Sequence, residues 1–202
     1  MKILRILWLA CLLLPAASLQ AIELRIGSKG AEISADGMGS LILEPPALVL
    51  DDGKTDKGVF EASSEKEGVA KYSDGSKVRY EVAEREIRCE YQPAAGVKAL
   101  RFQVILPLKL NQGGKFSFGD GELKEFPGEL VEQFVETSKN RDAFTVIDAM
   151  GDGLTINAPA NWQGLQDNRK FGWQVFAYQF LYDLKAHAGK NSLTISITPK
   201  KP

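Results

Sequence analysis

Apolar and polar residues alternate along most of the chain after residue 21, a pattern typical of β-strands with one face in a core. Residues 100–106 and 192–198 show it most clearly. In residues 173–182 both sets of alternate positions are mostly apolar, which predicts a central strand covered on both sides. At about 3.3 Å per residue this strand would span about 33 Å. We therefore expect the fold to be built around it.

Turn-forming sequences separate the strands. Asp74-Gly75 lies between two alternating runs and predicts a tight β-hairpin. Pro45 and Pro46 interrupt residues 40–50, and because proline donates no hydrogen bond to a β-ladder, this segment should form a sheet edge or a bend. The spacing of apolar residues at 130–135 fits either a short amphipathic helix or a bent strand.

Many short strands and at most one or two short helices predict the fold class. The expected fold is all-β, an antiparallel β-sandwich of jelly-roll or supersandwich-like form. An up-and-down barrel is the alternative.

Residues 1–21 differ from the rest of the chain. Lys2 and Arg5 precede an apolar run that ends in small residues at Ala21, as in a secretory signal peptide. A lipoprotein acylated at Cys11 is the alternative, but the apolar run continues past that cysteine. No later segment reaches the roughly 20 apolar residues of a membrane helix. We expect an exported protein, periplasmic or extracellular, with residues 22–202 as one β-sandwich domain and no membrane span.

Charge and cysteine content limit the expected partners. The chain has 25 basic and 26 acidic residues, so neither nucleic acid nor an anionic membrane is expected to bind it. Because Cys11 would be removed with the signal peptide, Cys89 could form no internal disulfide. Cys89 shares an apolar stripe with Ile87 and Tyr91, which predicts a buried thiol.

Few residues suggest catalysis. His187 is the only histidine and lies in a short turn, with no nucleophile motif in the chain to accompany it. One histidine and one remaining thiol do not make a closed zinc site, and the Gly-Asp turns at 119–122 and 151–153 lack calcium-loop spacing. We therefore predict no catalytic residue, metal or cofactor. Carboxylates are numerous enough for a glycosidase pair, but the sequence does not show which of them face each other.

A polar stretch at residues 161–173 combines aromatic and hydrogen-bonding side chains, and we expect it to form a loop before the central strand. Aromatic rings can stack on a sugar face while amides and charged groups bind its hydroxyls. In the alternative interpretation Asp167 and Arg169 pair to brace the loop, and Trp173 begins the strand inside the core. The candidate ligand-binding residues are Trp162, Gln163, Gln166, Asp167, Asn168 and Arg169.

Short motifs between residues 98 and 197 resemble the β-sandwich accessory domains of secreted carbohydrate-active enzymes. That resemblance implies a binding or scaffolding role. Such domains are usually attached to a catalytic module, for which this chain leaves no room. The motifs are Phe102-Gln103-Val104 with Leu106-Pro107, Glu125-Phe126-Pro127, Asp152-Gly153-Leu154-Thr155-Ile156, Leu165-Gln166-Asp167-Asn168-Arg169 and Gly172-Trp173.

Three functional hypotheses follow from these patterns. The first is a secreted or periplasmic, non-catalytic β-sandwich that binds a poly- or oligosaccharide. The second is a structural or protein-interaction domain of the cell envelope, which meets another envelope protein through its sheet edges or the charged residues 51–68. The third is a glycoside hydrolase or polysaccharide lyase that uses carboxylates, Tyr178, Lys170 or Arg169.

Overall fold

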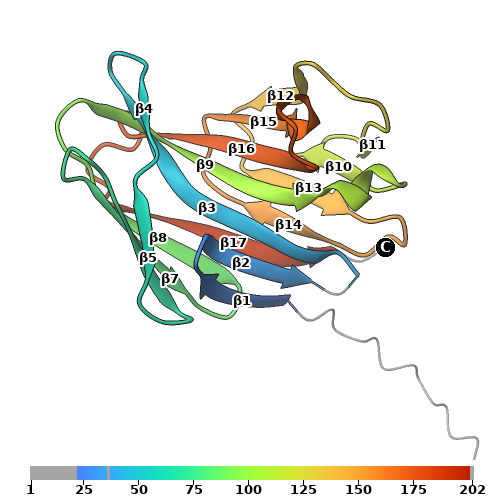
Figure 1. Cartoon of the computed structure of the whole chain (residues 1–202), viewed down its shortest axis with the longest axis horizontal. Helices are drawn as coiled ribbons and strands as arrows, with labels where there is room; N and C mark the ends of the chain where they lie inside the picture. The colour runs from blue at the N-terminus through green and yellow to red at the C-terminus, as the bar shows by residue number, and fades with distance from the viewer. Residues whose placement is uncertain (1–21, 36, 201–202) are drawn as a thin grey trace, which may run out of the picture.

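The computed structural model describes residues 22–35 and 37–200 and contains two antiparallel β-sheets (Figure 1). The predicted signal peptide, residues 1–21, lies outside the described residues. Sheet A has the order β1-β2-β3-β9-β16-β15-β12, and β4 pairs with β3 beside this path. Its strands are β1 (Ile22–Gly27), β2 (Gly30–Ala35), β3 (Gly39–Leu50), β4 (Thr55–Asp56), β9 (Val97–Pro107), β12 (Phe134–Lys139), β15 (Trp162–Asp167) and β16 (Val175–Asp183).

Sheet B has the order β11-β10-β13-β14-β17-β8-β7-β6-β5. Its strands are β5 (Val59–Ala62), β6 (Glu67–Lys71), β7 (Lys77–Val82), β8 (Glu86–Gln92), β10 (Lys115–Phe118), β11 (Lys124–Glu125), β13 (Ala143–Ile147), β14 (Gly153–Asn157) and β17 (Ser192–Lys200). The described helices are two short 3-10 turns, η1 (Leu108–Asn111) and η2 (Asn168–Phe171). The predicted all-β antiparallel sandwich is confirmed. Over the described ranges, no helix is long and apolar enough to cross a membrane.

Aromatic side chains fill the space between the sheets. The rings of Tyr178 on β16 and Phe144 on β13 stack across the two sheets, with centroids 4.1 Å apart. Phe102 and Phe180 stack at 4.8 Å on the neighbouring strands β9 and β16. Burying a side chain of this kind contributes about 1.5–3 kcal/mol. These rings therefore hold β9 and β16 with one set of alternate positions facing the core.

The predicted central strand is β16, which has β9 on one side and β15 on the other. The prediction that both of its faces are covered is wrong, because only one face packs against sheet B. The strand begins at Val175, and the prediction that Trp173 begins it inside the core is wrong. The backbone N–H of Trp173 donates to the carbonyl of Asn168, so this residue closes the η2 turn and does not join the strand. Its side chain is 56% exposed. Gly172, at φ 83°, provides the left-handed conformation that this turn needs.

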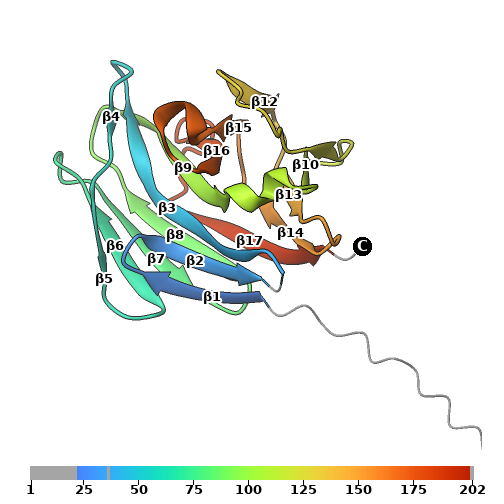
Figure 2. The same cartoon turned by 45° about the vertical axis from the view of Figure 1, so that its right-hand side comes forward.

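The two prolines of β3 lie at a bend. The bend is confirmed. The strand as a whole is interior, with β9 along one side, but at the two prolines its other side has no partner strand, so the predicted edge holds locally. Its pairing register with β9 shifts between Glu44 and Ala47. On the other side, β2 pairs with β3 as far as Leu43 and β4 pairs from Leu48, so Pro45 and Pro46 fall where the partner strand changes (Figure 2).

Two tyrosines of the β6–β7 hairpin, Tyr80 on β7 and Tyr72 just after β6, fix this bend. The Tyr80 hydroxyl donates to the backbone carbonyl of Glu44 at 3.3 Å, and the Tyr72 hydroxyl donates to the carbonyl of Pro46. At these positions β3 has no partner strand on the side of β2 and β4, so the hydroxyls supply hydrogen bonds in a gap of the sheet. The backbone of Glu44 is thus held from inside the sandwich.

Two local predictions are confirmed. Strands β6 and β7 form the hairpin around Asp74-Gly75, with Gly75 at φ 87°. Cys89 is fully buried, and burial raises the pKa of its thiol well above the ordinary value.

Two expected elements differ in the structure. Residues 161–173, predicted as a loop, form strand β15 and the turn η2. At residues 130–135 the helix alternative is wrong. The bent-strand alternative is confirmed in part, because the chain bends and enters β12 at Phe134, with a register shift against β15 between Phe134 and Glu136. The sequence did not predict strand β15 because two of its core-facing residues, Gln163 and Asp167, are polar. Their side chains form hydrogen bonds with neighbouring segments.

Substitution of Tyr178 tests the packing of the core. Its hydroxyl is buried and has no hydrogen-bond partner among the described residues. An unsatisfied buried hydroxyl costs about 1–3 kcal/mol, so Tyr178→Phe should raise the free energy of unfolding by about 1 kcal/mol in urea denaturation. Phe144→Ala, which removes the stacked ring, should lower it by about 3–5 kcal/mol. A loss of stability in Tyr178→Phe would show that the hydroxyl is bonded.

Candidate functional site

Four hydrogen-bonding side chains form a row across the outer face of sheet A, the face turned away from the core. Gln103 Nε2 donates to Glu44 Oε2 at 3.1 Å. Gln179 Nε2 donates to Gln103 Oε1 at 3.2 Å and to Gln166 Oε1 at 2.8 Å. This polar row (Glu44, Gln103, Gln179, Gln166) joins β3, β9, β16 and β15.

Strand register aligns the polar row. Glu44 lies opposite Gln103, and Gln103 lies opposite Gln179. Within the described chain, neither Glu44 Oε1 nor the Gln166 amide N–H groups have a hydrogen-bond partner. Both ends of the row therefore keep acceptor or donor capacity for a ligand.

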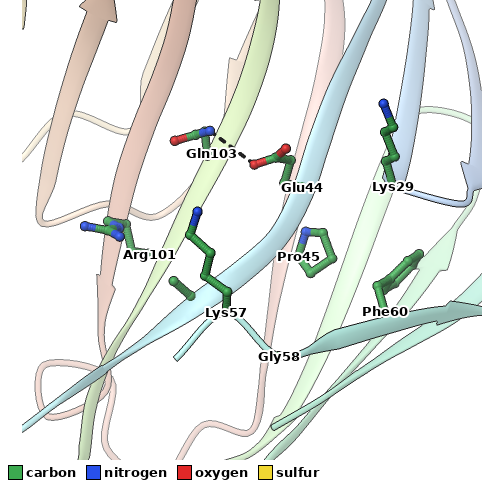
Figure 3. A pocket seen from close by; sticks show the side chains of 9 residues that line it. Lys29, Glu44, Pro45, Lys57, Gly58, Phe60, Arg101 and Gln103 are labelled. Atoms are coloured by element: carbon green, nitrogen blue, oxygen red, sulfur yellow. Dashed lines mark hydrogen bonds between the residues drawn. The ribbon is translucent and has the colours of Figure 1, made fainter. Parts of the chain in front are cut away.

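A basic hollow of about 380 Å³ lies at the β3 end of the polar row (Figure 3). The amino group of Lys57 points toward the Glu44–Gln103 pair in this view. Glu44 is the only carboxylate in its lining. The lining consists of Lys29, Glu44, Pro45, Ala47, Lys57, Gly58, Phe60, Arg101 and Gln103.

An aromatic hollow of about 440 Å³ adjoins the other part of the row. Arg101 lines both hollows, so the two hollows adjoin at this residue. The lining consists of Val49, Gly53, Thr55, Arg101, Phe134, Trp162, Gln179 and Leu181.

Gly164 makes room for the aromatic pair of this hollow. The rings of Phe134 and Trp162 meet edge to face, with centroids 5.2 Å apart. A Cβ atom at Gly164 would lie 2.6 Å from Trp162 Cη2 and 2.9 Å from Phe134 Cδ1. The Trp162 indole thus lies over the outer face of β15, partly exposed, beside the polar row.

The carboxyl group of Glu44 is electrostatically unusual. Burial raises its pKa, while Lys57, the hydrogen bond from Gln103 and Lys29 lower it; the net effect is a raised pKa. The polar row therefore ends in a carboxyl group that gains a proton more readily than an exposed glutamate.

The structure separates the six predicted ligand-binding residues. Trp162 and Gln166 lie on the outer face, whereas Gln163, Asp167 and Asn168 are buried. Ligand binding by this set stays a prediction, and the placement favours Trp162 and Gln166 as the residues that can meet a ligand.

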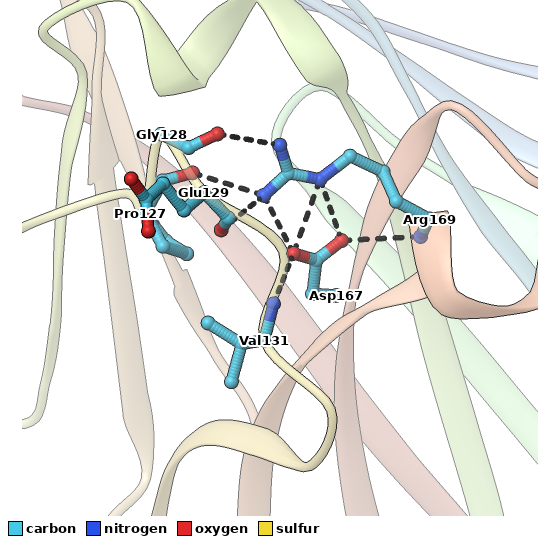
Figure 4. Close-up of polar contacts among 6 residues, drawn as sticks. All are labelled: Pro127, Gly128, Glu129, Val131, Asp167 and Arg169. Carbon is cyan, nitrogen blue, oxygen red and sulfur yellow. Dashed lines mark hydrogen bonds and ion pairs between the residues drawn. The ribbon is translucent and has the colours of Figure 1, made fainter.

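Asp167 and Arg169 form the brace of the alternative interpretation (Figure 4). The fully buried Asp167 carboxylate accepts from Arg169 Nε at 2.9 Å and from Arg169 Nη2 at 2.6 Å. The guanidinium also donates to the carbonyls of Pro127, Gly128 and Glu129, at 2.7–3.1 Å. The Val131 backbone N–H completes the network by donating to Asp167 at 3.1 Å.

The brace holds the segment that leads into β12. Because residues 127–131 are tied to the end of β15, Phe134 enters β12 in position to contact Trp162. Burial alone would raise the pKa of Asp167, but the bonds from the Arg169 side chain and from the Val131 and Arg169 backbone N–H groups outweigh it and lower the pKa. Arg169 and Asp167 are thus positioning residues for the aromatic hollow.

Sequence reasoning missed Glu44, Arg101, Gln103 and Gln179 as site residues. The available signal was Gln179, a polar side chain within an otherwise apolar central strand, together with the polar alternate positions of β9. What the sequence could not show was the register that brings them into one row.

The described residues bear on the expectations for a metal site and for the single histidine. Within residues 22–35 and 37–200 no three His, Cys, Asp or Glu side chains are grouped to hold a metal ion. His187 lies in a turn, as predicted, and is partly buried, with its ring stacked on that of Tyr182 at a centroid distance of 4.2 Å.

Comparison with known proteins leaves the family open. No family model and no curated protein sequence matches the chain. One similar solved structure is a family GH92 inverting mannosidase from Bacteroides thetaiotaomicron, with a TM-score of 0.43 and 10% sequence identity. The match covers 88% of this chain and 26% of the mannosidase. A likeness of this degree assigns neither a family nor an activity.

Asp167→Asn should destabilise the protein strongly. It leaves the Arg169 guanidinium without its counter-charge, and breaking a buried ion pair typically costs about 3–5 kcal/mol. Urea denaturation at pH 7 measures this loss.

Arg169→Lys keeps the charge but loses the planar guanidinium that reaches three carbonyls. Its free energy of unfolding should therefore fall by less than that of Asp167→Asn, but measurably. Because the pKa of Asp167 is lowered, the difference between wild type and Asp167→Asn should shrink as pH falls toward that lowered value.

Glu44→Gln should have the opposite pH dependence. A carboxyl group with a raised pKa binds a proton more tightly in the folded state, so its contribution to stability falls as pH rises from the ordinary to the raised value. Glu44→Gln should therefore gain stability relative to wild type across this window. Denaturation midpoints measured at several pH values test this, and a pH-independent difference between the two proteins would contradict it.

Proposed function

We propose that the chain is an exported, non-catalytic β-sandwich that binds carbohydrate on the outer face of sheet A. The observation behind the proposal is the polar row beside the partly exposed Trp162. Amide and carboxylate groups suit sugar hydroxyls, and an indole suits the apolar face of a sugar ring.

Preorganisation supports this use of the surface. Each glutamine of the row is held by a neighbour, and Gln103 and Gln179 project from the two strands that the aromatic core fixes. A ligand would therefore order few side chains on binding, which reduces the entropic cost. The signal-like residues 1–21 support export, where polysaccharides are common partners.

An enzymatic role is less well supported by this surface. Glycosidases of the common types use two carboxyl groups about 5–10 Å apart. Glu44 is the one acidic residue in the lining of the basic hollow, and the aromatic hollow has no acidic residue in its lining.

A second candidate function is interaction with another envelope protein. Phe171 and Trp173 are 60% and 56% exposed at the η2 turn, and Leu130 is 48% exposed. Exposed aromatic side chains are enriched at protein interfaces. This surface is distinct from the two hollows, so substitutions can tell the functions apart.

Titration calorimetry with a panel of neutral and acidic polysaccharides tests the carbohydrate proposal. We expect saturable binding of one sugar class and a loss of affinity of at least about tenfold, or about 1.4 kcal/mol, in Trp162→Ala. Gln179→Leu, a second variant on the same face, should also weaken binding. Circular dichroism and urea denaturation establish that each variant is folded.

Trp173→Ala is the matched control, since it removes an exposed tryptophan outside both hollows. It should bind as wild type does. Loss of binding in Trp173→Ala with retention in Trp162→Ala would overturn the assignment of the site, and no binding of any panel member by wild type would overturn carbohydrate binding.

A further inference from the structure

We propose that the outer face of sheet A selects an acidic saccharide, with the carboxylate of a uronate residue held in the basic hollow. This inference rests on the proposed carbohydrate function and names the ligand class of the same surface. It follows from the charges of the hollow.

Three cationic residues line the basic hollow, and they come from separate parts of the chain. Lys29 lies in the turn between β1 and β2, Lys57 between β4 and β5, and Arg101 on β9. None of them forms an ion pair within 4.0 Å of a described acidic residue. With three cations and one carboxylate in its lining, the hollow carries a positive charge, although the chain as a whole has a net charge of −1.

The carboxylate of Glu44 does not neutralise these cations by direct contact. Its Oε2 accepts a hydrogen bond from Gln103, and its pKa is raised by burial in spite of Lys57 and Lys29. The cations therefore remain available to a ligand anion. Arg101 adds a planar guanidinium, which suits a carboxylate because it can donate two parallel hydrogen bonds.

The place of Arg101 connects the anion site to the rest of the surface. It lines both hollows, so a sugar carboxylate bound near Arg101 would put adjoining sugar residues along the polar row toward Trp162. The row crosses four strands spaced about 4.8 Å apart, or about 14 Å in all, which is longer than one sugar ring. The surface thus fits an oligosaccharide with an acidic residue better than a free monosaccharide.

The test compares binding of polygalacturonate, alginate and hyaluronan with binding of dextran, galactan and fully methyl-esterified polygalacturonate. We expect at least one uronate polymer to bind at least tenfold more tightly than every neutral polymer. For polygalacturonate, methyl esterification removes the charge but keeps the sugar backbone. Affinity for the acidic polymer should fall as salt is raised.

Two double variants, each of which removes two lysine charges, test whether uronate binding depends on the basic hollow. Lys29→Gln with Lys57→Gln changes two exposed residues that line only the basic hollow, so the fold should be kept and uronate binding should fall at least tenfold. Lys185→Gln with Lys190→Gln removes the same charge from exposed positions outside both hollows and should leave binding unchanged. Glu44→Gln, which removes the one negative charge, should strengthen uronate binding.

Each outcome has a distinct meaning. Equal or tighter binding of neutral polymers, weakened by Trp162→Ala, would overturn the acidic-ligand inference and leave the proposed function standing. Equal losses in the two lysine pairs would show general attraction between charges and would also overturn it. No binding of any of the six polymers would overturn both.

Discussion

The outer surface of this sandwich depends on the two-residue alternation of β9 and β16, which the aromatic core enforces. Phe102 and Phe180 are stacked inside, so Gln103 and Gln179 on the same strands must face outward. A slip of one residue would bury these amides among rings and expose the phenylalanines. Core packing and the alignment of the polar row are therefore set by one register, and the site's geometry follows from the energetics of the core.

Much of the fold was readable from the sequence. The alternating runs, the Asp74-Gly75 hairpin and the bend at Pro45 depend on local chemistry that acts within a few residues. Strand β15 was not readable, because its core-facing residues Gln163 and Asp167 break the apolar pattern. Their polar groups find partners in segments remote in sequence, which no local pattern can show.

The candidate site was predictable only in part for the same reason. Trp162 and Gln166 drew attention as an aromatic and an amide in one polar stretch, and the structure places both on the outer face. Glu44 and Gln103 lie 59 positions apart in the chain, and only strand pairing brings their side chains together. Asp167 and Arg169, which resemble ligand-binding residues in composition, bind the backbone of residues 127–131.

The prolines of β3 also govern how another chain could approach this sheet. Between the ends of β2 and β4 the strand has an open flank, where an extended peptide would normally add by backbone hydrogen bonding. Pro45 and Pro46 have no N–H to offer, and the carbonyls of Glu44 and Pro46 are already bonded to tyrosine hydroxyls. The gap therefore disfavours strand addition and self-association by sheet extension at this point, while the side chains of Glu44 and Pro45 stay partly exposed. Recognition at this gap would have to use side chains and not the backbone.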